Sequence, residues 1–259
     1  MSTSPLMTPP PIEPAESGLS EPSRLINTFI APSKTFTDIR NNASWWVPWV
    51  VAAVFSLITA FVIVQKIDME TLLTHRAAQS KLAQRQLEQA SPEQREQGMR
   101  IQVIATKVQF FARPIFGLLG ALIVAAILMA IFNFGFAAEI PFKRALAVVL
   151  YAGLPIAVVR GVLLCLSLLV SGDPSSIDPD INPIATNAAF FMDRATSNKF
   201  LYTIISGFDV LAIWSILLLG IGFAIAANNP KVTKGTTLTV LFGIYAFVIL
   251  VLAGLSGFF

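Results

Sequence analysis

The feature that most constrains this chain is the separation of its charged residues from long apolar segments. Five such segments together contain one charged side chain, that of Arg160; they cover residues 45–64, 115–137, 145–170, 210–227 and 236–258. Because a hydrocarbon layer about 30 Å thick is crossed by roughly 20 helical residues, each segment is near or above the length of one crossing. The sequence therefore predicts an all-α integral membrane protein with five transmembrane helices, and it excludes a soluble enzyme.

The N-terminal region indicates a tail followed by two short helices at the membrane surface. Residues 1–22 are rich in Pro and Ser and hold no Lys or Arg, which predicts a disordered tail and no cleavable signal peptide. Residues 23–30 and 33–40 repeat apolar side chains at helical spacing on either side of Pro32, with cations such as Arg24 beside them. We expect two interfacial helices in the headgroup layer, with a soluble linker as the alternative.

The start of the first span carries aromatic anchors. Trp45, Trp46 and Trp49 surround a proline in the first turn of the predicted helix. Indole rings prefer the membrane–water interface, and a proline there forfeits only an amide that has no intrahelical partner. We therefore expect these three tryptophans to hold that end of the span at the interface.

Residues 65–112 form a polar insertion after the first span. The segment is rich in Ala and Gln and carries seven basic side chains and the only histidine, His75. Ser91 has the pattern of a helix N-cap, with proline directly after it and Gln94 three positions on. The sequence predicts a polar helical hairpin outside the bilayer. His75 has no second ligand nearby and is interpreted as a solvated surface residue.

The connection between the third and fourth spans, residues 171–209, begins acidic and ends apolar. Asp178 and Asp180 lie in its proline-rich first part, whereas residues 200–208 are apolar again. Joined to the fourth span, this last stretch would be too long for one crossing. We expect a short interfacial or re-entrant helix that turns at Gly207 into the fourth span.

Basic residues in the short turns indicate how the chain crosses the membrane. Lys143 and Arg144 lie between spans two and three, and Lys231 and Lys234 lie between spans four and five. Because cytoplasmic loops are enriched in Lys and Arg, these turns predict a cytoplasmic N-terminus and an external C-terminus. The basic insertion at 65–112 conflicts with this rule, since it would then lie outside.

Arg160 is the one charge within the five spans. A charge at mid-bilayer costs roughly 2.5–3.5 kcal/mol on insertion scales, so it normally faces protein or water. Arg160 lies in the half of its helix nearer to the third connection, and Asp209 begins the fourth span from that same side. We treat the two as a candidate intramembrane polar pair. A structural ion pair, an arginine that reaches the surface, and a polar site for an ion, a solute or a moving element remain alternatives.

Two spans carry small residues four positions apart. Such residues let helices approach closely, although the pattern is common, so we expect helix packing from both. They are Gly117, Ala121 and Ala125 in the second span, and Gly220, Ala224, Gly222 and Ala226 in the fourth.

The sequence lacks the motifs of several enzyme classes. It contains no GxxxxGK[ST] phosphate loop, no HExxH metal motif and no second histidine for a catalytic pair. The single cysteine, Cys165, lies within the third span and is expected to be inert packing. The basic residues are scattered rather than gathered with aromatics, so nucleic acid is not an expected partner. We expect no enzyme activity, cofactor or metal.

Three segments resemble one known family. They are RLINTFIAPSKTFTDIRNNASWWVPWV at residues 24–50, LYAGLPIAVVRG at 150–161 and SGFDVLAIWSILLLGIGFAIA at 206–226. In order and content they resemble the Yip domain of the Ypt/Rab-interacting membrane proteins. The positions that match the family motifs are Pro32, Phe36, Tyr151, Pro155, Asp209 and Trp214.

The resemblance implies that residues 23–259 form a five-helix membrane domain with a cytoplasmic N-terminus. Eukaryotic members of the family act in the early secretory pathway, bind Rab-type GTPases and influence membrane shape or vesicle formation. The insertion at 65–112 and the long third connection depart from that compact pattern. The chain is more similar to the prokaryotic branch, which implies the bacterial inner membrane, and no GTPase-binding residue is carried over.

The function we expect is that of a non-enzymatic multi-pass protein that organises the lipid bilayer or membrane or cytoplasmic protein partners. It would act through the insertion at 65–112 and the short N-terminal helices, and a homo-oligomer is compatible with this role. The alternative is a small solute or ion transporter or channel that uses Arg160 and Asp209. No inverted repeat is evident, which favours the first hypothesis.

Overall fold

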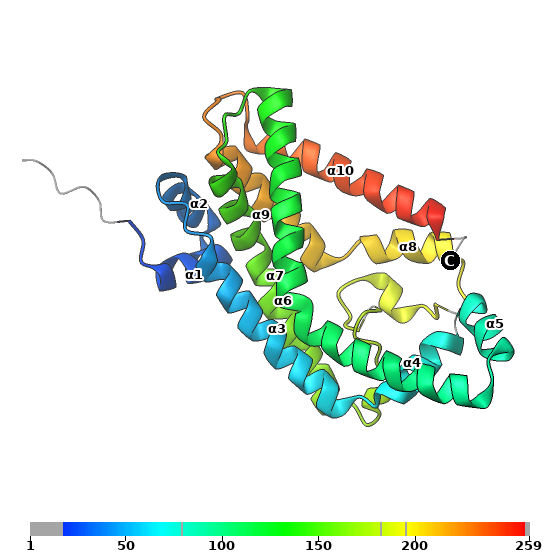
Figure 1. Cartoon of the computed structure of the whole chain (residues 1–259). Helices are drawn as coiled ribbons and strands as arrows, with labels where there is room; N and C mark the ends of the chain where they lie inside the picture. Colours follow the sequence, from blue (N-terminus) through cyan, green and yellow to red (C-terminus); the bar gives the residue numbers. More distant parts are fainter. Residues whose placement is uncertain (1–17, 79, 182, 195, 257–259) are drawn as a thin grey trace, which may run out of the picture.

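The computed structural model describes residues 18–78, 80–181, 183–194 and 196–256, and all regular secondary structure in these ranges is helical (Figure 1). Most of the predicted tail at 1–22 lies outside the described residues. The α-helices are α1 Glu21–Ile30, α2 Pro32–Asn41, α3 Trp46–Lys66, α4 Met69–Ala78, α5 Lys81–Gln89, α6 Pro92–Phe136, α7 Phe142–Val170, α8 Lys199–Gly207, α9 Val210–Ala226 and α10 Lys234–Leu255. The prediction of an all-α fold is confirmed.

Among the described residues, four single helices are long and apolar enough to cross a membrane, namely α3, α6, α7 and α10. The predicted span at 210–227 corresponds to α9, whose 17 residues extend about 25 Å. α8 and α9 pass the same test only as a pair, bent by 49° at the break between them. The predicted turn after Gly207 is therefore present. The described residues thus hold four candidate spans, or five if the bent pair is counted as one, and the chain has the character of a multi-pass membrane protein.

The polar insertion differs from the predicted two-helix hairpin. It consists of α4, α5 and the first half of α6, and α6 then continues without interruption into the second span. Ser91 caps α6 as predicted, because its hydroxyl accepts from the Gln94 N–H at 3.3 Å while its own N–H donates to the Gln94 side chain at 2.9 Å. Figure 1 shows that α6 changes direction near its middle, where Pro114 lies. A proline removes a helical hydrogen bond and commonly bends a helix.

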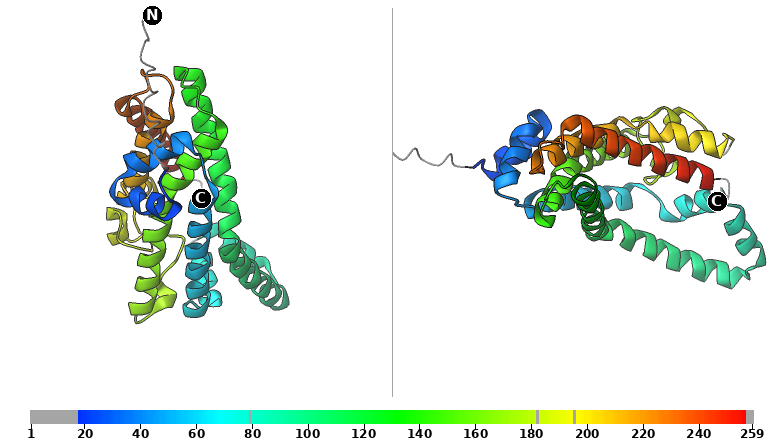
Figure 2. Two further views of the ribbon diagram at one scale, coloured as in Figure 1. Left: turned by 90° about the vertical axis from the view of Figure 1, so that its left-hand side faces the viewer. Right: turned by 90° about the horizontal axis from the view of Figure 1, so that it is seen from above.

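We call α4, α5 and residues 92–113 of α6 the platform. Figure 2 shows that the platform extends to the side of the molecule opposite to α1 and α2. The side chains at 84–89 and 91–97 are all exposed. The platform is therefore a polar projection from an apolar helix bundle.

The short turns of the bundle meet at one end. The Asn228 N–H donates to the Ala138 carbonyl at 2.9 Å, and the Asn229 side-chain amide donates to the Phe136 carbonyl at 2.9 Å. The Arg144 guanidinium donates to the Ala226 carbonyl at 3.0 Å. The turns after α6 and after α9 therefore lie side by side. Successive spans that cross in alternating directions place these two turns at the same end of the bundle.

The N-terminal helices pack into the bundle rather than lying free on its surface. α2 packs against α9 and α7, where Phe36 and Ile39 are fully buried. On α1, Phe29 meets the Trp214 ring edge-on at 6.1 Å, whereas Ile26 and Ile30 are exposed. The position of both helices in the headgroup layer stays a prediction, with which packing of one face on the bundle is compatible. One side of each helix belongs to the protein core, because a bundle with a 17-residue α9 leaves apolar surface that α1 and α2 cover.

The small residues of the two spans differ in their surroundings. An added Cβ at Gly222 would lie 2.5 Å from Val148 Cγ1, and one at Gly220 would lie 2.4 Å from Leu238 Cδ2. At Gly117 an added Cβ would meet no atom within 4 Å. Both predicted glycines of α9 therefore lie at close helix contacts, and Gly117 in α6 does not.

Candidate functional site

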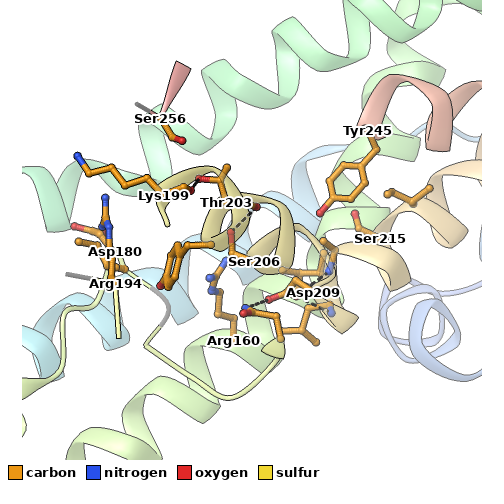
Figure 3. A pocket seen from close by; sticks show the side chains of 17 residues that line it. Arg160, Asp180, Arg194, Lys199, Thr203, Ser206, Asp209, Ser215, Tyr245 and Ser256 are labelled. Carbon is orange, nitrogen blue, oxygen red and sulfur yellow. Dashed lines mark hydrogen bonds between the residues drawn. The ribbon is translucent and has the colours of Figure 1, made fainter. Parts of the chain in front are cut away.

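A cavity of about 800 Å³ lies beside the break between α8 and α9 (Figure 3). Its walls come from α7, the third connection, α8, α9 and α10. Arg160 reaches it from α7, and Asp209 reaches it from the start of α9. The structure thus brings both predicted polar residues to the same cavity.

Arg160 and Asp209 nevertheless form no ion pair among the described residues. The Asp209 carboxylate accepts from two N–H groups in the first turn of α9, at 2.9 and 3.1 Å, and so caps that helix. Its other oxygen accepts from the Thr186 hydroxyl and, at 3.3 Å, from the Asn187 amide. Both oxygens of this carboxylate are thus occupied by other donors, and the alternative of a structural Arg160–Asp209 ion pair is not realised in the described part of the chain.

The Arg160 side chain is exposed, and no hydrogen bond or ion pair within the described part of the chain involves it. It also lines a second cavity, of about 290 Å³, together with Thr59 and Arg113. Arg160 therefore lines both cavities. An intramembrane charge in such a place faces water or a ligand rather than lipid tails.

A second polar cluster joins the platform to the third connection. Arg76 in α4 donates to both oxygens of Asp178, at 2.7 and 2.5 Å, and to Asp180 at 2.9 Å. Arg113 in α6 also donates to Asp180. We call these four residues the clamp. Sequence reasoning missed it, although the basic insertion and the acidic connection, predicted on one side of the membrane, were the signal for it.

The contacts within the clamp shift the pKa values of Arg76 and Asp178. Burial raises the pKa of Asp178, but hydrogen bonds from Arg76 and from the backbone outweigh burial and lower that pKa below its ordinary value. Hydrogen bonds to Asp178 and Asp180 raise the pKa of Arg76, against the opposing effect of its burial. Because folding lowers the pKa of the Asp178 carboxyl, the stability that it contributes is present at neutral pH and is lost as the pH falls below about 4.

Removing the clamp is expected to loosen the platform selectively. With Arg76→Gln, amide hydrogen exchange in α4 should accelerate roughly 5- to 30-fold, which corresponds to about 1–2 kcal/mol for partly exposed charged hydrogen bonds. Acidification of the unaltered protein from pH 5 to pH 3 should act in the same direction. Arg100→Gln is the matched control, because its ion pair with Glu96 is mostly exposed. Equal exchange in the two variants would show that the clamp does not hold α4.

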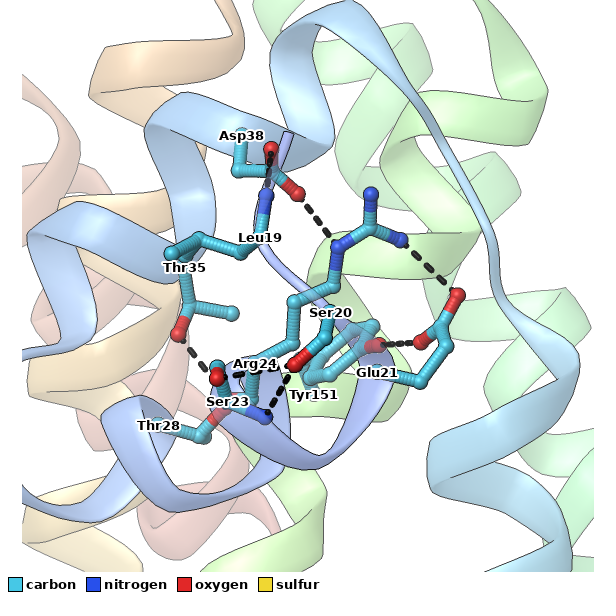
Figure 4. Close-up of polar contacts among 9 residues, drawn as sticks. All are labelled: Leu19, Ser20, Glu21, Ser23, Arg24, Thr28, Thr35, Asp38 and Tyr151. Atoms are coloured by element: carbon cyan, nitrogen blue, oxygen red, sulfur yellow. Dashed lines mark hydrogen bonds and ion pairs between the residues drawn. The ribbon is translucent and has the colours of Figure 1, made fainter. Parts of the chain in front are cut away.

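A buried network ties α1 to α2 and α7 (Figure 4). The Arg24 side chain is 2% exposed and donates to Asp38 in α2 and, at 3.0 Å, to Glu21. The second oxygen of Glu21 accepts from the Tyr151 hydroxyl of α7 at 3.0 Å. Arg24 was expected beside lipid headgroups. It is instead inside the protein, because its acidic partners lie on the faces of α1 and α2 that are turned to the bundle.

The family-motif positions lie mostly in this part of the core. Phe36 and Tyr151 are fully buried, and Trp214 packs beside them and is partly buried. Pro155 is buried inside α7, which continues through it, and Pro32 is the first residue of α2. These residues hold α1 and α2 on the bundle and do not form a concave site.

The three tryptophans of the first span differ from one another. Trp45 is partly buried against the core, and Trp46 is 57% exposed. The Trp49 indole N–H donates to the Pro114 carbonyl at 3.2 Å, at the bend of α6. That bond gives Trp49 a structural partner within the protein. The interfacial role of the other two stays a prediction.

The described residues hold no group of three or more His, Cys, Asp or Glu side chains that could bind a metal. The Cys165 thiol faces the Thr59 hydroxyl at 3.8 Å, and no second cysteine exists in the sequence. The chemistry that the site offers is therefore charge and hydrogen bonding, centred on the cavity around Arg160.

Comparison with known proteins agrees with the arrangement of the helices. The Yip1 domain matches residues 26–254, which is most of the chain and, among the described residues, includes all candidate spans except the last residue of α10. No curated protein and no solved structure matches. The match covers the buried Phe36, Tyr151 and Trp214 as well as the capping Asp209. This chain therefore belongs to the Yip1 family of multi-pass membrane proteins.

Proposed function

We propose that this protein is a non-enzymatic member of the Yip1 family that holds a protein partner on its platform, in the bacterial cytoplasmic membrane. The clamp carries this proposal. It fixes a projecting polar segment to the bundle through Arg76 and Arg113, while the side chains at 84–89 and 91–97 stay exposed. A surface whose backbone is already ordered loses less entropy when a partner binds.

Site-specific photocrosslinking in cells tests this role. A photoreactive residue at Gln86 or Gln97, both exposed on the platform, should give a discrete protein adduct. Phe247 on α10, which is exposed on the apolar bundle, serves as the control position and should give none. The Asp178→Asn variant should reduce the platform adduct, because it loosens the clamp. No discrete adduct at either platform position would contradict the proposal.

The orientation that we propose places the N-terminus in the cytoplasm and the platform outside. Two observations support it. The basic turns after α6 and α9 lie together at one end, and the clamp neutralises Arg76 of the insertion that conflicted with the charge rule and Arg113 at its edge. In a Cys165→Ser background, Gln97→Cys should react with an impermeant maleimide in spheroplasts. Ser20→Cys should react only after permeabilisation, and the reverse pattern would invert the orientation.

Transport is the second candidate function, and the cavity shared by Arg160 and Asp209 is the observation that favours it. In that case Arg160→Leu should abolish a measurable ion or solute flux in proteoliposomes while the fold is retained. If the protein only holds partners, neither the unaltered protein nor the variant carries a flux.

A further inference from the structure

More cationic than acidic side chains line the cavity beside the α8–α9 break. Three cations line it, Arg160 from α7, Arg194 from the third connection and Lys199 from the start of α8. All three side chains are exposed. Within the described ranges, none of the three makes a side-chain hydrogen bond or an ion pair.

The two acids that line the same cavity are already occupied. Asp180 is bound by two arginines of the clamp, and Asp209 caps α9 and accepts from the third connection. Asp180 is neutralised by the clamp arginines, whereas the partners of Asp209 are neutral and leave its negative charge in place. The three cations therefore still exceed the remaining carboxylate by two positive charges. Several positive charges that share a recess with low-dielectric walls attract an anion, and such focusing raises the local concentration of anionic ligands.

The remaining walls of the cavity are apolar. Ile156 of α7 and Leu211 and Ile216 of α9 face it from the transmembrane part of the bundle. Arg194 and Lys199 approach it from the extramembrane connection and the adjoining helix (Figure 3). One part of the cavity wall is therefore cationic, and the adjoining part is apolar. At about 800 Å³ it is in the size range of sites for sizeable organic ligands and far larger than one small ion requires.

We propose that this cavity binds a phosphate-type anion that is carried on an apolar tail, namely the headgroup of an anionic phospholipid. Arg160, Arg194 and Lys199 contact the phosphate oxygens, because guanidinium and ammonium groups form charge-assisted hydrogen bonds with phosphate. This inference goes beyond partner binding at the platform and does not depend on it.

Native mass spectrometry of the full chain in detergent tests the proposal, with equimolar phosphatidylglycerol and phosphatidylcholine offered together. The unaltered protein should retain phosphatidylglycerol preferentially. The cavity variant Arg160→Gln/Arg194→Gln/Lys199→Gln should lose at least about tenfold of that preference, since each charge-assisted contact is worth roughly one decade of affinity. The control variant Arg85→Gln/Arg95→Gln/Lys107→Gln removes the same charge from exposed platform positions and should keep the preference.

A second arm identifies the source of the anion. Inorganic phosphate is titrated against the same protein, and the melting temperature is followed by tryptophan fluorescence. Stabilisation by phosphate without any preference for phosphatidylglycerol would overturn the lipid as the occupant in favour of the free ion. Equal lipid binding by the cavity and control variants would overturn the site itself. If the triple cavity variant does not fold, Lys199→Gln alone, at an exposed position, should give a smaller loss in the same direction, and no loss would contradict the proposal.

Discussion

Replacing Arg24 by alanine is expected to lower the free energy of unfolding by about 3–5 kcal/mol, the usual cost of breaking a buried ion pair from one side. The variant leaves the Asp38 carboxylate, whose side chain is only 12% exposed, without its cation. It also releases Glu21, which the Tyr151 hydroxyl of α7 contacts. Since this network connects α1, α2 and α7, both N-terminal helices should detach from the bundle early in unfolding.

Reversible unfolding in mixed micelles, followed by tryptophan fluorescence, measures this effect. Trp214 is a direct reporter, because Phe29 of α1 packs against its ring. Arg40→Ala is the matched control, since Arg40 lies on α2 but is exposed, and a change within about 0.5 kcal/mol is expected there.

A double variant separates packing from charge. Arg24→Met combined with Asp38→Leu removes both charges together and should recover most of the lost stability, because an apolar pair of similar volume replaces a desolvated ion pair at little cost. If Arg24→Ala were as mild as Arg40→Ala, the network would not hold the N-terminal helices. If the double variant were no better than the single one, the loss would come from side-chain volume and not from an unpaired carboxylate.

Gly222→Leu is expected to destabilise the bundle by about 3 kcal/mol, the upper end of the usual cost of overpacking. A single Cβ at this position would already lie 2.5 Å from Val148 Cγ1 and 3.1 Å from the Phe36 ring. The larger side chain must push α9 away from α7 and α2 together. The same unfolding assay measures the loss. Gly222→Ala should also lower the stability, and adding Val148→Ala to that variant should restore part of the stability that it lost.

Gly243→Leu in α10 provides the comparison for this prediction. An added Cβ there would meet nothing within 4 Å, and leucine has the higher helix propensity, so stability should not fall. A loss as large as that of Gly222→Leu would mean that any bulky residue in a span is harmful. Little effect at Gly222 would show that α7 and α9 are not closely packed in the membrane.

Some elements could be predicted because their causes are local in the chain. The apolar runs place the spans, since length and hydropathy alone decide whether a helix can cross lipid. Ser91 begins α6 because its hydroxyl and Gln94 satisfy each other's backbone groups within one turn. The break after Gly207 follows from the excess length of the apolar run that contains it, and the resemblance to the Yip domain follows from the order of short motifs.

Other features depend on residues that are distant in the sequence. Asp209 was correctly placed at the start of the fourth span, but its partners, Thr186 and Asn187, come from a connection whose path no local pattern reveals. The insertion at 65–112 was predicted as a helical hairpin of two helices. Instead, α6 runs on from it into the second span, because nothing in the helix around Pro114 forces it to end.

The sequence by itself determined that this protein is helical and multi-pass, because segregated charge and helix length act residue by residue, and the order of its short motifs indicated the Yip1 family. The tertiary structure alone decided which charges are paired. Arg24 and Arg76 find carboxylates on other helices or loops, whereas Arg160 shares a cavity with an aspartate that is already occupied. Ion pairing requires atoms within about 4 Å, and only the packing of the helices brings such distant positions together.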